Sequence, residues 1–276
     1  MVNITTGYFD LRQICKSGQC FRMNEISDGE FEVIAGDKYL RVYEGRVKGF
    51  PQGVCFDVDE EEFESFWKHY FDLDTDYGRY IRSVDHKDEY LNRVIKLSSG
   101  IRILNQDLWE MIVSFLISQQ NNISRIKKCI DNISKKYGTK CINKYGGEYY
   151  AFPTPKQLAL PDEDALMECN LGYRSKYVVR TANEVHSGKL DLDIYRSCDY
   201  ERAKTELLKL YGVGKKVADC ICLFALHHID AFPIDTHINQ VLEKYYKDGF
   251  PFERYVGFAG VIQQYIFFYD LTSDSK

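Results

Sequence analysis

The stretch that most constrains this fold is residues 206–241, where two glycines separate two apolar runs of helical period. Gly212 and Gly214 flank a valine, and leucines before them and aliphatic residues after them recur at helical spacing. A helix ending at Gly212 and a second starting near Gly214 would form a helix–hairpin–helix, because glycine permits a positive φ and a close backbone approach. An ordinary helical hairpin with a glycine C-cap is the alternative.

Two lysines, Lys215 and Lys216, lie in the first turn of the expected second helix. The helix dipole favours acids at that end, so two cations there are unusual. The free backbone N–H groups of the same turn point outward and suit an anion. An anionic partner such as DNA would resolve the conflict, whereas the simpler interpretation is a pair of solvated surface lysines.

The charge distribution matters more than the net charge of −5. Residues 57–77 contain nine acids and one base, which is −8 and leaves +3 for the rest of the chain. Residues 121–140 contain six Lys or Arg residues against one acid. A local basic surface is therefore compatible with an acidic protein, although a solvated lysine face would give the same count.

The order of the patterns along the chain predicts an α+β fold. Residues 31–35, 39–44 and 47–50 are β-rich and separated by turn residues. From residue 60 onward the period is helical, and we predict the following helices: 60–71, 87–98, 107–118, 122–137, 174–187, 199–211, 214–227, 234–246 and 252–270. We expect an N-terminal antiparallel sheet domain with a flanking helix at 1–80 and a helical domain at 81–276.

Two further properties bound the class of protein. No apolar run approaches the roughly 20 residues of a membrane span. Nine cysteines are scattered without a framework, which favours free thiols in a reducing compartment.

A resemblance to a known family rests on several motifs in order. The hairpin matches the pattern L-x-G-V-G-x-K, followed by a helix and a loop at 230–237 that contains Pro233 and ends in Asp235. It resembles the helix–hairpin–helix (HhH-GPD) DNA glycosylases, with the motif itself at about 199–227. Motifs similar to the 8-oxoguanine DNA glycosylase/lyases lie elsewhere: SGQCFR at 17–22, YFDLD at 70–74, ISQQNNISRI at 117–126, LGYRSKYV at 171–178 and GVIQQYIFFYDL at 260–271.

This resemblance implies a fold and a chemistry. The sheet domain would be like half of a TATA-binding protein, followed by an all-helical glycosylase body. Lys216 would be the nucleophile, attacking the deoxyribose and forming a Schiff base that permits β-elimination. The neighbouring charge of Lys215 and the positive helix end would help keep its amine neutral. Asp235 would stabilise developing positive charge on the sugar and also cap the next helix.

The same resemblance assigns the lesion pocket and the DNA backbone contacts. A flipped-out purine needs stacking on its faces and hydrogen bonds to its edges. Cys220 and Phe267 would sandwich the base, Gln263 would bind its pairing edge, and Asp270 would complete that helix face. The carbonyl of Gly18 would accept the proton that distinguishes 8-oxoguanine from guanine. Phosphate contacts would come from the following residues: Gly212, Gly214, Lys215 and His237.

Four residues are assigned to the opposite strand. Arg125 and Arg174 match arginines that contact the unpaired cytosine, and Tyr173 matches a wedging tyrosine. Gln120 stands where the family has asparagine, so the fit of this longer amide in the vacated space is open. Tyr211 stands where relatives often have proline, a change that we expect to matter little.

The expected partner is double-stranded DNA with 8-oxoguanine, preferentially opposite cytosine, bound by a monomer. No cofactor is expected: iron–sulfur relatives carry a cysteine pattern beyond the Asp helix, and no cysteine follows Cys222. The hairpin leaves room for a structural cation. We expect an intracellular, DNA-associated protein, in the cytoplasm or nucleoid of a prokaryote or the nucleus of a eukaryote. Two alternatives remain: another base glycosylase of the superfamily, or a non-catalytic DNA-binding module.

Overall fold

The computed structural model describes residues 1–45 and 53–273. The chain forms two compact units that interleave along the sequence. The first contains residues 1–32, 40–105 and 227–276, and the second contains residues 33–39 and 106–226. The boundary expected at residue 80 stays a prediction.

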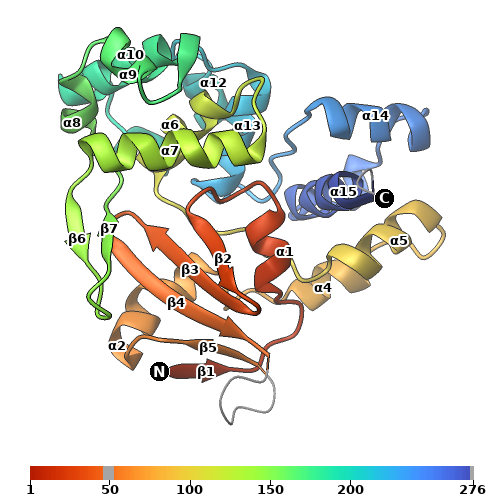
Figure 1. The fold of residues 1–276 in the computed structure, drawn as a ribbon. Helices are drawn as coiled ribbons and strands as arrows, with labels where there is room; N and C mark the ends of the chain where they lie inside the picture. The colour runs from red at the N-terminus through yellow and green to blue at the C-terminus, as the bar shows by residue number, and fades with distance from the viewer. Residues whose placement is uncertain (46–52, 274–276) are drawn as a thin grey trace. The chain divides into compact units, whose positions relative to one another are not determined.

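The sheet has five strands in the order β1-β5-β4-β3-β2 (Figure 1). Their bounds are β1 Val2–Ile4, β2 Met23–Ser27, β3 Glu30–Ala35, β4 Lys38–Glu44 and β5 Val54–Phe56. β5 pairs antiparallel with both β1 and β4, and Phe56 lies opposite Val42 in the second pair. β3 alternates half-buried and buried residues, the period of a strand with one covered face. The strands predicted at 31–35 and 39–44 are confirmed, and the one at 47–50 lies outside the described residues.

Three strands and two helices of the first unit had too little apolar periodicity to be predicted. These are β1, β2 and β5 together with α1 (Leu11–Lys16) and α4 (Tyr77–Arg82). The other helical elements are α2 Glu60–Glu62, the π-helical η1 Phe63–Trp67, α3 Lys68–Tyr70, α5 Glu89–Ser98, α14 Thr236–Tyr245, the 3₁₀ turn η3 Phe252–Arg254 and α15 Ala259–Ser273. The single helix predicted over 252–270 is wrong, because Gly257 has φ 88° and breaks it. α15 packs against α5 and α14.

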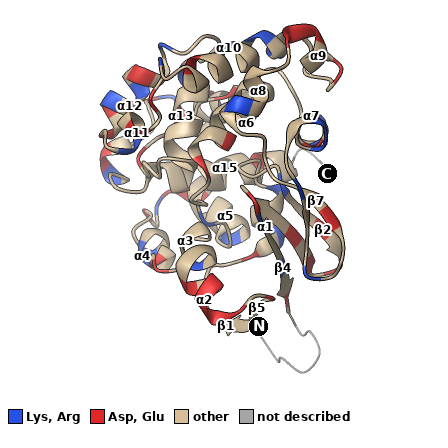
Figure 2. Ribbon diagram, turned by 90° about the vertical axis from the view of Figure 1, so that its left-hand side faces the viewer, with Lys and Arg blue, Asp and Glu red and all other residues tan. Residues whose placement is uncertain are grey.

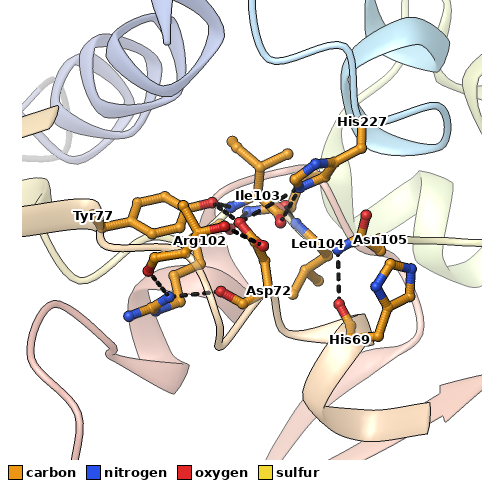
Figure 3. Close-up of polar contacts among 10 residues, drawn as sticks. His69, Asp72, Tyr77, Arg102, Ile103, Leu104, Asn105 and His227 are labelled. Atoms are coloured by element: carbon orange, nitrogen blue, oxygen red, sulfur yellow. Dashed lines mark hydrogen bonds and ion pairs between the residues drawn. The ribbon is translucent and has the colours of Figure 1, made fainter. Parts of the chain in front are cut away.

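A buried polar cluster joins distant segments of the first unit (Figure 3). Asp72 accepts hydrogen bonds from the Tyr77 hydroxyl at 2.8 Å and from Thr75 at 2.7 Å. Arg102 donates to the Asp72 carbonyl at 2.7 Å, and its guanidinium lies 4.6 Å from the centre of the Tyr77 ring. His227, which begins the C-terminal segment, lies 3.6 Å from Asp72 Oδ2 and 3.2 Å from the Ile103 carbonyl. These contacts tie the C-terminal segment to the rest of its unit.

The second unit is built around α6 (Leu108–Ser118), every residue of which is buried. Its other elements are α7 Ile123–Tyr137, β6 Lys140–Ile142, β7 Glu148–Tyr150, α8 Pro155–Ala159, α9 Glu163–Met167, the 3₁₀ turn η2 Gly172–Arg174, α10 Ser175–His186, α11 Asp193–Arg196, α12 Tyr200–Leu207 and α13 Lys215–Phe224. α7, α10 and α13 all contact α6. The antiparallel pair β6–β7 corrects the expectation of an all-helical body.

Charge is segregated between elements as the sequence indicated. Figure 2 shows the acidic residues of α2 in red and basic residues of α7 in blue. On α7, Lys135 pairs with Asp131 and Lys136 pairs with Glu168, so the C-terminal half of this helix is largely neutralised. None of the described helices has the length and apolar character needed to span a membrane.

Candidate functional site

The helix–hairpin–helix predicted from the glycines is present in the second unit. α12 ends at Leu207 rather than near Gly212, because Leu208–Leu210 form tight turns, and α13 begins at Lys215. Asp219 is buried on α13 and accepts hydrogen bonds across the pair, from the Tyr200 hydroxyl at 2.6 Å and from Lys204 Nζ at 2.8 Å. This buried carboxylate fixes the two helices of the motif against each other. An acid within an apolar helical run was its only sequence signal.

The two hairpin glycines have different reasons to be glycine. Gly212 has φ 90°, and a Cβ there would lie 2.6 Å from the Tyr177 ring. Gly214 is extended, with φ −98° and ψ 177°, and a Cβ there would meet nothing within 4 Å. The expectation of a positive φ is therefore confirmed for Gly212 and wrong for Gly214. Gly214 instead leaves open space beside the first N–H groups of α13.

The first turn of α13 combines cations with an uncapped helix end. No side chain caps its N-terminus, and the turn contains no acid. Lys215 is exposed, whereas Lys216 is half-buried with its Nζ 5.5 Å from the centre of the Phe115 ring. Among the described residues no carboxylate forms an ion pair with Lys216. Cys220 is buried one helical turn further along the same helix.

Three of the predicted opposite-strand residues, Gln120, Tyr173 and Arg174, form one cluster. Gln120 is exposed and has φ 47°, a left-handed conformation unusual for glutamine. Arg174 is only 4% exposed, and its guanidinium donates to the carbonyls of Gln119 at 2.8 Å and Gln120 at 2.9 Å. It also stacks on Tyr173, 4.6 Å from the ring centre. Arg174 therefore holds the loop that carries Gln120, a role that the motif did not indicate.

Arg125 lies in the first turn of α7. Asn122 caps this helix by accepting from the Arg125 N–H at 2.9 Å. The Arg125 side chain is exposed, and among the described residues it forms no ion pair. Of the two arginines, Arg125 is thus the one whose donors are available to a ligand.

In the first unit, predicted residues of α14 and α15 contact one another through a hydrogen bond and a ring contact. Asp235 caps α14, with its Oδ1 accepting from the Ile238 N–H at 2.9 Å. His237 Nδ1 lies 2.9 Å from Asp270 Oδ2, and its ring meets Phe267 edge-on with centroids 5.8 Å apart. Asp270 therefore orients His237. The family resemblance placed Asp270 on the base-recognition face and did not predict this contact.

Gln263 and Gly18 are held by the same helix, α15. Gln263 is buried and donates to the Pro233 carbonyl at 2.9 Å, while its Oε1 is buried with no hydrogen-bond partner. Its neighbour Gln264 donates to the Ser17 carbonyl, and Gly18 follows with φ 74°. An unpartnered buried acceptor is costly unless a ligand supplies a donor. The Oε1 of Gln263 is thus an acceptor that a bound ligand can satisfy.

Comparisons with known proteins agree with this geometry. Residues 1–112 match the family model described as 8-oxoguanine DNA glycosylase, N-terminal domain. Residues 113–249 match the model of the HhH-GPD superfamily base excision DNA repair protein.

Among similar proteins, the structure of the Clostridium acetobutylicum 8-oxoguanine glycosylase/lyase, in complex with double-stranded DNA containing cytosine opposite 8-oxoG, is 34% identical. It matches with a TM-score of 0.89 and covers 99% of each chain. The Saccharomyces cerevisiae N-glycosylase/DNA lyase is 35% identical over 164 residues, 55% of this chain and 44% of that protein. A probable N-glycosylase/DNA lyase of Methanothermobacter thermautotrophicus is 28% identical over 87% of this chain and 84% of its own. The match thus spans less than half the length of the yeast relative.

Proposed function

Because this chain belongs to the 8-oxoguanine DNA glycosylase family of the HhH-GPD superfamily, we propose that it excises 8-oxoguanine from duplex DNA and then nicks the strand. The observation that supports this most strongly is the half-buried Lys216 amine, free of any described ion pair, in the first turn of α13. A lysine held by a carboxylate would be tied to that partner, whereas the Lys216 amine is free to approach the sugar of a bound nucleotide.

The reaction follows from that amine. The neutral nitrogen of Lys216 attacks C1′ of the damaged nucleotide, and the bond from C1′ to the base breaks with its electron pair leaving on the base. The departing base takes up a proton. Loss of the amine proton and opening of the sugar give an imine between Lys216 and C1′. Removal of a proton from C2′ then expels the 3′ phosphate and cuts the strand.

Asp235 serves this chemistry through its negative charge. One of its oxygens is held by the cap of α14, which fixes the orientation of the carboxylate. A fixed carboxylate stabilises the positive charge that develops on the sugar as the base leaves. His237, oriented by Asp270, binds a backbone phosphate.

The lesion is read by residues of α15 and the loop at Gly18. The unpartnered Oε1 of Gln263 accepts from the pairing edge of the base, and Phe267 stacks on one of its faces. The carbonyl of Gly18 accepts the ring N–H that guanine lacks. The partner is double-stranded DNA with the lesion opposite cytosine. From this partner we infer a DNA-associated protein, in the cytoplasm or nucleoid of a prokaryote or the nucleus of a eukaryote.

Borohydride trapping tests the nucleophile, because it reduces the imine to a stable covalent complex. With duplex DNA containing 8-oxoguanine, the wild-type protein and Lys215→Gln should both trap DNA. Lys216→Gln should trap none and release no base, while still binding the duplex. Trapping by Lys216→Gln at the wild-type level would refute the assignment.

A further inference from the structure

An aromatic row on the second unit connects η2 and α10 with the hairpin. Tyr173 meets Tyr177 edge-on at 5.9 Å between ring centroids, and Tyr177 meets Tyr211 in the same way at 5.3 Å. Tyr177 also covers the face of Gly212, so the row ends against the hairpin backbone. Tyr173 and Tyr211, at its two ends, are 46% and 40% exposed.

Two cations of α10 converge on the exposed ring of Tyr211. The Arg180 guanidinium lies 4.5 Å from the ring centre, and Lys176 Nζ lies 6.0 Å from the same ring and 5.4 Å from that of Tyr177. Aromatic faces attract cations but do not neutralise them. Two like charges on one ring repel each other, so their convergence favours an anion between them.

The nearby acidic residues do not neutralise both cations. Arg180 Nε pairs with Glu184 at 3.3 Å, and Glu184 is shared with Lys189. This contact orients the guanidinium and leaves its two terminal nitrogens without a described partner. Lys176 forms no ion pair among the described residues. A forked pair of N–H donors beside a second ammonium suits the oxygens of a phosphodiester.

We propose that Lys176, Arg180 and Tyr211 form a phosphodiester-binding subsite for the DNA backbone next to the hairpin. The proposal rests on DNA being the partner in the proposed function. Lys176 and Arg180 bind the phosphate oxygens, and Tyr211 positions both cations and offers its ring to the adjoining sugar. The aromatic row makes this subsite continuous with the hairpin, because Tyr177 packs on both Tyr211 and Gly212. The tyrosine in place of proline therefore has a function.

The dependence of binding on salt measures phosphate contacts directly. Each contact contributes about 0.9 to the slope of log affinity against log salt concentration. The variants Lys176→Gln and Arg180→Gln should each reduce this slope by about one, and the double variant by about two. Lys209→Gln is the matched control, since Lys209 is an exposed lysine near the hairpin that is already paired with Glu206 at 2.6 Å. Its slope should equal that of the wild type.

Tyr211→Leu keeps an apolar side chain but removes the ring on which both cations rest. It should weaken binding to undamaged duplex at low salt by about three- to ten-fold. Single-turnover excision by Lys209→Gln at saturating protein should stay within two-fold of the wild type. A wild-type salt slope in the double variant would overturn the subsite. Failure of the proposed function itself would look different, as absence of base release by the unmodified protein.

Discussion

The contrast between the two hairpin glycines gives a prediction whose size follows from the structure. Gly212→Ala places a methyl group 2.6 Å from the Tyr177 ring at φ 90°. The left-handed backbone costs an L-residue about 1–2 kcal/mol, and displacing a packed ring costs about 1–3 kcal/mol more. We therefore expect the free energy of unfolding to fall by about 2–5 kcal/mol. Urea denaturation followed by circular dichroism measures it.

Gly214→Ala is the matched control and should behave in the opposite way. Its backbone is extended and its surroundings are open, so the loss of stability should stay below about 1 kcal/mol. The added methyl group stands where a DNA backbone would approach the N–H groups of α13, so DNA affinity should fall at least ten-fold. Equal stability losses in the two variants would refute this separation of roles.

Three further predictions use the same structure. Burial lowers the pKa of His227 despite the opposing charge of Asp72. The unfolded chain thus binds the proton more tightly, so the free energy of unfolding is retained above the ordinary pKa of about 6.5 and falls as the pH drops below it. Asn tolerates the φ of 55° at this position, so His227→Asn should fold and lose less stability at acid pH, as measured by urea titrations. Asp235→Asn keeps a good N-cap, so the free energy of unfolding should change by less than about 0.5 kcal/mol. Because the variant loses the carboxylate charge, excision should slow at least 100-fold. Full activity would remove Asp235 from the mechanism. Arg174→Lys replaces the guanidinium fork that donates to the Gln119 and Gln120 carbonyls with a single ammonium, and should lower the free energy of unfolding by about 1–3 kcal/mol. Arg125→Lys should leave the free energy of unfolding unchanged.

Local patterns predicted most of the helices and the hairpin because each depends on residues close in sequence. The amphipathic period located α5, α7 and α10, and the glycine pair located the start of α13. The short strands β1 and β5 could not be predicted, since three residues carry no measurable period and their pairing is set by partners about 50 residues away. β6 and β7, also three residues each, are hidden among polar residues.

The sequence also could not predict which side chains contact one another. Spacing placed Asp270 and Phe267 on one face of α15, but only the fold shows that His237 bonds to that aspartate. The motif assigned Arg174 to an unpaired base, whereas its burial against Gln119 and Gln120 gives it a structural task. Asp219 and Tyr177 lie within the quoted motifs, but the motifs assigned them no role, because their importance lies in contacts with other segments.

The central claim, that this protein removes 8-oxoguanine paired with cytosine, is tested most directly by excision from four duplexes. Each carries 8-oxoguanine opposite a different base, with an otherwise identical duplex containing guanine as the control, and base release is measured in single turnovers. The account predicts the fastest release opposite cytosine, by about ten-fold or more, and none from the guanine duplex. Equal rates opposite all four bases would contradict the assigned preference, and no release from any of them would contradict the function.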